Sequence, residues 1–102
     1  MRVSVVIPAL NEEATVAGVV KAALASCASE VIVVDSDSTD ATAAVARDAG
    51  ATVLNWRDIA PDIPVRPGKG EALWRGVRAA TGDVVVFLDA DVTTVEPGWV
   101  DG

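Results

Sequence analysis

The residues best placed to do chemistry are Asp89 and Asp91, which follow the apolar run Val84 to Leu88. Such a run of β-branched and aromatic residues predicts a strand buried on both faces of a sheet. Ligands of open α/β sheets bind outside the carboxyl ends of the strands, where these carboxylates should therefore lie. Hard divalent cations that carry phosphates take such oxygen ligands. The pair indicates a metal and diphosphate site; the alternative is a capped turn beside a solvated carboxylate.

Two more polar segments follow predicted strands. Residues 8–12 follow a strand at 3–7, and residues 35–38 follow a strand at 31–34. Carboxylates in these segments could accept hydrogen bonds from a base N–H or a ribose hydroxyl. Taken singly, Glu12 is typical of a helix start. Residues 35–38, taken singly, are typical of a capped turn. Together with Asp-x-Asp on one edge of a sheet, they favour a nucleotide site.

The loop at residues 66–70 is basic, and its positive charge suits the anionic part of a nucleotide. Its glycines, Gly68 and Gly70, let the backbone approach a ligand, and the N-terminus of the following helix attracts anions. We expect Lys69 and Arg66 to contact nucleotide or phosphate oxygens, and the alternative is a solvated flexible loop. The spacing is not that of a P-loop, and the absence of glycine after the first strand excludes a dinucleotide fingerprint.

The elements that must position these groups alternate between strand and helix. In chain order the pattern predicts a strand at 3–7, a helix capped by Asn11 that runs to about residue 25, a strand at 31–34, a helix at 39–49 capped by Ser38, a weaker strand at 51–54, a helix from about 71 to 80, and a strand at 84–88. We expect Leu73, Val77 and Ala80 to form the core face of the last helix. This alternation predicts a parallel α/β sheet with right-handed crossovers.

Composition limits the function further. The 102 residues predict one domain, residues 1–102, and the net charge of −7 argues against nucleic acid as the main partner. The absence of histidine excludes Ser-His-Asp catalysis and most zinc chemistry. The single Cys27 fits a reducing compartment, and no apolar segment is long enough to span a bilayer. We therefore expect a soluble, cytoplasmic protein.

Three segments, residues 5–13, 34–40 and 82–91, resemble the donor-site signatures of family-2-like GT-A glycosyltransferases. Residues 64–75 are more specific and closely resemble a segment of the glucosyl-3-phosphoglycerate synthase family. The resemblance covers essentially the whole chain. It implies the Rossmann-like parallel sheet of a GT-A nucleotide-diphospho-sugar transferase, in the strand order 3-2-1-4 and truncated after the Asp-x-Asp strand.

That family is a retaining hexosyltransferase that moves glucose from UDP-glucose to 3-phosphoglycerate with Mg²⁺ or Mn²⁺. The resemblance implies that Ala9, Leu10, Glu12 and Ser36 line the uridine, that Gly68 and Lys69 hold the nucleotide, that Asp89 faces the ribose or sugar, and that Asp91 ligates the metal. The family's catalytic and acceptor residues are expected beyond Gly102. The chain is therefore expected to be the donor-binding half.

Two positions depart from the family pattern. Asp37 stands where glycine is usual, so a positive φ there would be either strained or tolerated, as aspartate sometimes tolerates it. Ala90 replaces the common serine of Asp-x-Asp. The alternatives are another GT-A transferase, with GDP-mannose or a polyprenyl-phosphate acceptor, and a non-catalytic nucleotide-binding module. A sheet with an open flank exposes apolar surface, so we also expect association between copies.

Overall fold

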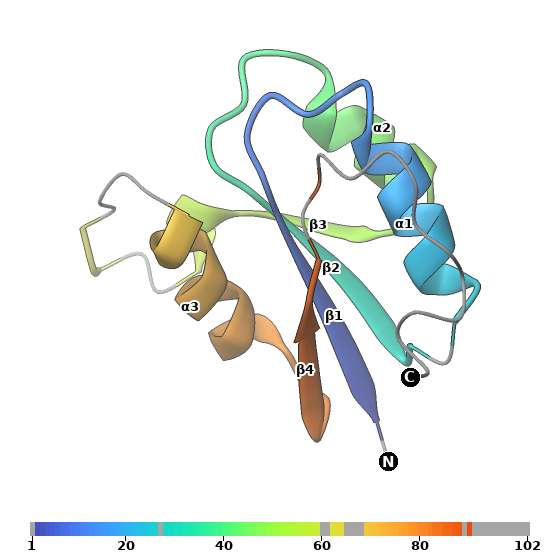
Figure 1. Cartoon of the computed structure of the whole chain (residues 1–102). Coiled ribbons are helices and arrows are strands. Elements are labelled where there is room, and N and C mark those ends of the chain that lie inside the picture. Colours follow the sequence, from blue (N-terminus) through green and yellow to red (C-terminus); the bar gives the residue numbers. More distant parts are fainter. Residues whose placement is uncertain (1, 27, 60–61, 65–68, 89, 91–102) are drawn as a thin grey trace.

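The protein is a four-stranded parallel sheet with helices on both faces (Figure 1). The structure, a computed structural model, describes residues 2–26, 28–59, 62–64, 69–88 and 90. In chain order the elements are β1 (Val3–Ala9), α1 (Val16–Leu24), β2 (Glu30–Asp35), α2 (Thr42–Asp48), β3 (Thr52–Asn55), the 3₁₀ helix η1 (Trp56–Asp58), α3 (Lys69–Ala79) and β4 (Val84–Phe87). The strand order β3-β2-β1-β4 confirms the predicted sheet. Among the described residues, no helix is both long and apolar enough to cross a membrane.

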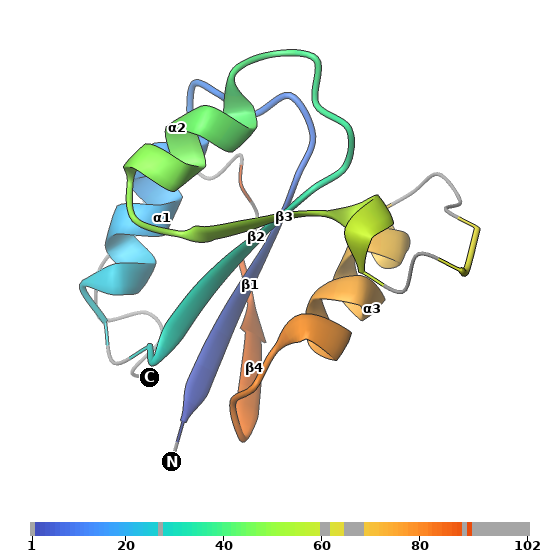
Figure 2. The same ribbon diagram turned by 180° about the vertical axis from the view of Figure 1, so that it is seen from behind.

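The alternation of side chains along the strands produces two cores, one on each face of the sheet. Val5 and Ile7 of β1 face α1 and α2, whereas Val6, between them, faces α3. Figures 1 and 2 show α1 and α2 together on one side of the sheet and α3 on the other. Because β1 is covered on both faces, its residues from Ser4 to Ala9 are all buried.

The predicted core face of α3 is correct at Ala80, which packs against the core, and wrong at the larger side chains. Val77 is 47% exposed, and the face turned to the sheet carries Ala72, Arg75 and Gly76 instead. A Cβ on Gly76 would overlap a methyl group of Val6, so the helix backbone packs directly on the sheet. This close contact leaves no room for large side chains such as Leu73. The apolar periodicity therefore predicted the wrong large residues for the core face of α3.

The two predicted helix caps are also wrong. Helices α1 and α2 begin at Val16 and Thr42, and neither has a side-chain cap from its N-cap residue. Asn11 instead has a left-handed backbone, with φ of 54°, and its side chain bonds to another loop, as does that of Ser38. The predicted end of the second helix is correct, because Gly50 follows α2 with φ of 112°.

Strand β4 is less buried than predicted. Val84 and Phe87 are 38% and 45% exposed, while Val85 and Val86 are half-buried. Among the described strands, β4 pairs only with β1, so it lies at an edge of the sheet. Its apolar sequence has the pattern of a fully buried strand, but the described residues cover it only in part, at Val85 and Val86.

Candidate functional site

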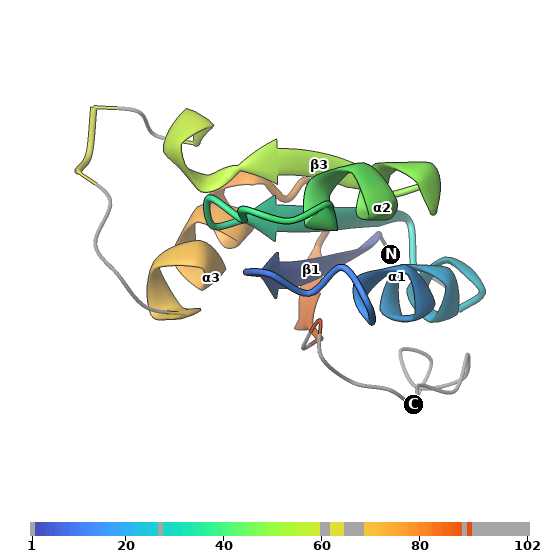
Figure 3. The ribbon, with the colours of Figure 1, turned by 90° about the horizontal axis from the view of Figure 1, so that it is seen from above.

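The ends of β1, β2 and β3 lie in one row. Asp35, the last residue of β2, is in register with Ala9 of β1 and with Asn55 of β3. The view down onto the sheet in Figure 3 shows the loops that leave these ends. The polar segments after the first and second strands therefore converge on one edge, as the sequence predicts.

Asp35 is the most distinctive residue of this edge. It is only 7% exposed, and its Oδ2 accepts a hydrogen bond from the Ser38 N–H at 3.3 Å. Its Oδ1 is buried and has no hydrogen-bond partner among the described residues. Buried oxygens are rarely left unpaired, so this atom is an acceptor available to a ligand. The sequence placed Asp35 among the carboxylates of residues 35–38 that could accept a hydrogen bond from a base, whereas the family resemblance marked Ser36 in this turn.

Four predicted site residues lie together around this edge. The Ser36 N–H donates to the Ala9 carbonyl at 2.9 Å, which joins the ends of β2 and β1. Leu10 follows Ala9 in the chain, and its apolar side chain is 54% exposed among polar loop residues. The Glu12 N–H donates to Thr42 Oγ1 at 2.8 Å, so its backbone lies at the start of α2. Ala9, Leu10, Glu12 and Ser36 are thus brought together, as predicted.

A set of hydrogen bonds between side chains and backbone joins the loop after β1 to the loop after β2. Asn11 Oδ1 accepts from the Thr39 N–H at 2.8 Å, and the Asn11 N–H donates to Ser38 Oγ at 2.9 Å. The Glu13 N–H donates to Asp40 Oδ2 at 3.3 Å. We call these five residues, Asn11, Glu13, Ser38, Thr39 and Asp40, the loop clasp. The sequence signal was the density of Ser, Thr and Asp at 35–42, which the prediction assigned to a capped turn.

The loop clasp also organises the start of α2. Asp40 Oδ1 accepts from the Thr42 N–H at 2.9 Å and from the Thr42 hydroxyl, and these bonds hold the pKa of Asp40 below its usual range. Glu13 Oε2 accepts from the Ala41 N–H at 3.1 Å. Carboxylates at a helix N-terminus satisfy free N–H groups and oppose the helix dipole. The first turn of α2 is therefore capped from both loops.

Asp37 has φ of 61°, so the position does adopt the positive φ discussed above. Its Oδ1 accepts from Asn55 Nδ2 at 3.1 Å, and its Oδ2 lies 2.7 Å from Arg57 Nε. The Asn55 amide has the largest effect, followed by the Trp56 indole and then the Arg57 guanidinium, and together they hold the pKa of Asp37 below its usual range. The carboxylate therefore connects the turn after β2 to η1.

The Asp-x-Asp segment is described only at its middle residue. Ala90 is buried, and its carbonyl accepts from Thr15 Oγ1 at 2.6 Å, which places it against the start of α1. Asp89 and Asp91 lie outside the described residues. In the part of the chain that the structure describes, no three His, Cys, Asp or Glu side chains gather as a metal site. The metal assignment therefore stays a prediction.

The basic loop is described only at its end. Lys69 is the first residue of α3, earlier than the predicted start near Glu71, and its side chain lies outside the description, as do Gly68 and Arg66. Helix α3 ends at the amino edge of the sheet, where Thr81 and Gly82 lead into β4 (Figure 1). Its first turn therefore points toward the carboxyl edge that carries the other predicted residues.

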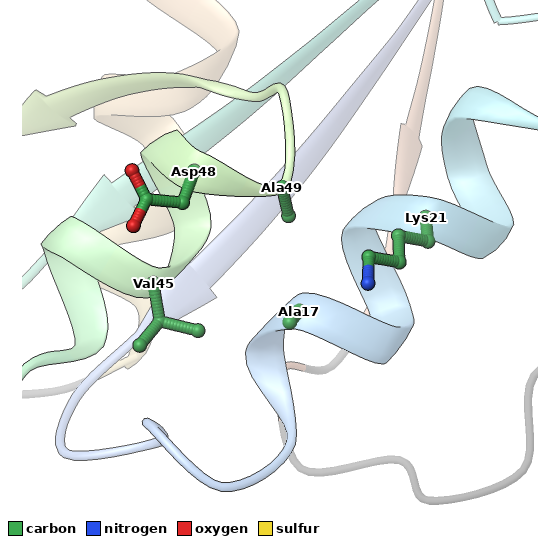
Figure 4. Close-up of a pocket in the computed structure, with 5 residues that line it drawn as sticks. All are labelled: Ala17, Lys21, Val45, Asp48 and Ala49. Atoms are coloured by element: carbon green, nitrogen blue, oxygen red, sulfur yellow. The ribbon is translucent and has the colours of Figure 1, made fainter.

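A pocket of about 200 Å³ lies between α1 and α2 (Figure 4). It is lined by Ala17, Lys21, Val45, Asp48 and Ala49. None of the predicted site residues contributes to it. The candidate site is therefore the loop-lined edge of the sheet and not this pocket.

Comparison with known proteins agrees with the geometry of this edge. Residues 4–101 match the family described as glycosyl transferase family 2. The chain is 48% identical over 101 residues to the glucosyl-3-phosphoglycerate synthase of Mycobacterium tuberculosis, a match that covers 96% of this chain and 31% of that protein. The similar protein from Petrotoga mobilis is 35% identical over 108 residues, covering 100% of this chain and 33% of its own length.

A solved structure shares the fold closely. The Mycobacterium tuberculosis glucosyl-3-phosphoglycerate synthase in complex with Mn²⁺, UDP-glucose and phosphoglyceric acid superposes with a TM-score of 0.92 at 47% identity. The match covers 98% of this chain and 36% of that one. The likeness confirms the predicted GT-A fold. The chain spans about a third of the length of the curated relatives it matches.

Proposed function

Because the chain belongs to glycosyl transferase family 2, we propose that its loop-lined edge binds UDP-glucose for a glucosyl-3-phosphoglycerate synthase reaction. The observation that carries the proposal is the buried Asp35 Oδ1, an acceptor without a partner among the described residues, between the ends of β1 and β3. Similarity to a relative solved with UDP-glucose and phosphoglyceric acid supports the choice of donor and acceptor.

The described residues suit a uridine. A uracil ring offers one N–H donor, which a carboxylate oxygen such as Asp35 Oδ1 can accept. Leu10 offers an exposed apolar surface on which a planar base can pack. Ser36 and Glu12 complete the lining by resemblance, in a frame held by the loop clasp. A carboxylate acceptor and an apolar surface recognise a base in two different ways, which together fix its orientation.

We propose that Lys69, Gly68 and the N-terminus of α3 hold the diphosphate, and that Asp91 ligates a divalent cation with Asp89 facing the ribose or sugar. Carboxylate oxygens suit Mn²⁺ or Mg²⁺, and the solved relative contains Mn²⁺. When bound, such an ion stabilises the negative charge of the UDP leaving group. Transfer to 3-phosphoglycerate, with retention, is proposed for a protein of the relatives' full length, to which these 102 residues contribute the donor and metal part.

The test is a calorimetric titration of the chain with UDP-glucose, with and without Mn²⁺ or Mg²⁺. We expect metal-dependent binding that Asp91→Ala removes and that GDP-mannose does not reproduce. Asp62→Ala, which changes an exposed carboxylate away from the strand ends, is the matched control. Binding that is equal with and without metal would contradict the metal assignment, and preference for GDP-mannose would contradict the donor.

A second variant tests the base contact. Asp35→Asn keeps the size of the side chain and replaces one acceptor oxygen with a donor. We expect weaker binding of UDP and of uridine alone, because an amide donor facing the ring N–H loses the hydrogen bond. Unchanged uridine affinity would remove Asp35 from the proposed site.

A further inference from the structure

Asp37 holds an unusual backbone conformation next to the proposed base site. Its φ of 61° lies in the left-handed region, which costs a residue with a side chain free energy. Its carboxylate contacts Asn55, the last residue of the neighbouring strand β3, at 3.1 Å, and Arg57 of η1 at 2.7 Å. Each carboxylate oxygen has its own partner, so the side chain is fixed in one orientation.

The two partners are fixed to each other as well. Asn55 Oδ1 accepts from the Arg57 N–H at 2.9 Å, which caps η1. Asn55 is also in register with Asp35 across the β2–β3 pair. Asp37, Asn55 and Arg57, which we call the outer latch, therefore link the turn after β2 to the turn after β3.

We propose that the outer latch is a positioning device that holds the turn carrying Ser36 and Asp35 in its nucleotide-binding shape. Asp37 lies between Ser36 and Ser38, and the Ser38 N–H is the donor that orients the Asp35 carboxylate. The Ser38 hydroxyl accepts from the Asn11 N–H, so a shift of this turn also disturbs the loop clasp. This inference rests on the proposed function.

The exposure of the ion pair separates positioning from folding. The side chains of Arg57 and Asp37 are 62% and 38% exposed. Exposed ion pairs contribute little to global stability, so loss of this one leaves the sheet and its two cores intact. Its effect is local, on the turn after β2. A variant without the latch should therefore fold normally and bind UDP less well.

The experiment is a double-mutant cycle on UDP affinity, measured by calorimetry with Mn²⁺, using Arg57→Ala, Asp37→Gly and the double variant. Glycine adopts positive φ without cost, so Asp37→Gly removes the carboxylate without adding strain. We expect Arg57→Ala to weaken UDP binding about three- to fivefold in the wild-type background, the range of an exposed ion pair. In the Asp37→Gly background we expect it to change nothing. Arg78→Ala, at an exposed position of α3, is the control.

Each other outcome overturns the inference. Wild-type affinity in Arg57→Ala shows that the latch does not position the turn. An equal loss in both backgrounds shows that Arg57 acts without Asp37, and a melting temperature that falls with the affinity shows a role in folding. A wild-type chain that binds no UDP overturns the proposed function together with this inference, whereas wild-type binding without coupling between the two sites overturns only the latch.

Discussion

The side-chain oxygen of Asn11 lies 2.8 Å from the backbone nitrogen of Thr39 and 3.3 Å from its hydroxyl. This one acceptor joins two loops that leave neighbouring strands. The backbone of Asn11 is left-handed, with φ of 54°. Asparagine tolerates that conformation better than most residues with a side chain. Both the backbone and the side chain of Asn11 are therefore suited to the loop clasp.

Replacing Asn11 separates these two contributions. Asn11→Gly removes only the hydrogen bonds and should lower the free energy of unfolding by about 1 kcal/mol. Asn11→Ala also places a Cβ in the left-handed region, at a further cost of about 1–2 kcal/mol. Urea unfolding of both variants measures the difference. Equal losses of stability in the two variants would mean that backbone strain contributes nothing at this position. We also expect both variants to bind UDP more weakly than the wild type.

The parts of the fold that depend on local pattern were predictable. Each strand appeared as an apolar run, and alternation with helices predicted the parallel sheet. The strand order, which the structure confirms, came from the family resemblance. Helix starts were not predictable in the same way. Asn11 and Ser38 have the residue types of helix caps, but the side chain of each bonds to the other loop. These contacts join residues far apart in the sequence, so a local sequence pattern does not predict them.

The candidate site also contains residues that the sequence indicates and residues that only the structure brings out. Ala9, Leu10, Glu12 and Ser36 were named from the family resemblance of the strand ends; the structure places them on one edge, and their role in binding stays a prediction. The sequence offered Asp35 as one of several carboxylates at the strand ends, but it does not show that one of its oxygens is buried without a described partner, or that Arg57 contacts Asp37. The inward face of α3 was misjudged because its close approach at Gly76 admits small residues and one buried arginine rather than large apolar side chains.

That close approach is tested by a pair of glycine substitutions. Gly76→Ala places a Cβ against a Val6 methyl group and 3.3 Å from Val34 Cγ2, so α3 or the sheet must shift. Overpacking of this kind costs about 1–3 kcal/mol. Gly18→Ala, in α1, meets nothing within 4 Å and should instead stabilise by about 0.5–1 kcal/mol through helix propensity.

Chemical denaturation of the two glycine variants and the wild type measures both effects. The expected result is opposite signs for the same change of residue in two helices. A stabilised Gly76→Ala variant would show that α3 does not pack directly on β1.

Glu30 predicts how stability depends on pH. Its Oε2 accepts from the buried Ser4 hydroxyl and from the Thr81 N–H at 2.7 Å, and these bonds lower its pKa below the ordinary value of 4.5. The folded state therefore binds this proton less readily than the unfolded state does. The stabilisation is complete above about pH 4.5 and is lost as the pH falls through the lowered pKa.

Glu30→Gln should reduce the free energy of unfolding at pH 7 and flatten its decline below pH 4.5. The remaining decline is expected from groups such as Asp40, whose pKa is also lowered. Denaturant unfolding of both proteins between pH 7 and pH 3 is the measurement. Asp62→Asn, at an exposed carboxylate, serves as the control, and a decline as steep in Glu30→Gln as in the wild type would exclude Glu30 as its source.

Arg75 should be the side chain whose polar contacts contribute most to folding. Its guanidinium is fully buried, pairs with Glu71 at 2.9 Å, and donates to the carbonyls of Trp56, Ile59 and Ile63. Trp56 lies in η1, while Ile59 and Ile63 lie outside any helix or strand, so their carbonyls have no regular ladder to satisfy them. One side chain of α3 thereby holds the segment after β3 against the helix.

Arg75→Met removes every one of these donors and leaves the Glu71 carboxylate only 13% exposed without its main cationic partner. Breaking one side of a buried pair costs about 3–5 kcal/mol, and we expect that loss in denaturant unfolding. Arg75→Lys restores the charge without the planar fork of donors, so it should recover only part of the loss. The matched control is Arg78→Met, an exposed arginine of the same helix, which should change stability by less than about 0.5 kcal/mol. If Arg75→Met and Arg78→Met were equally mild, the segment after β3 would not depend on this guanidinium.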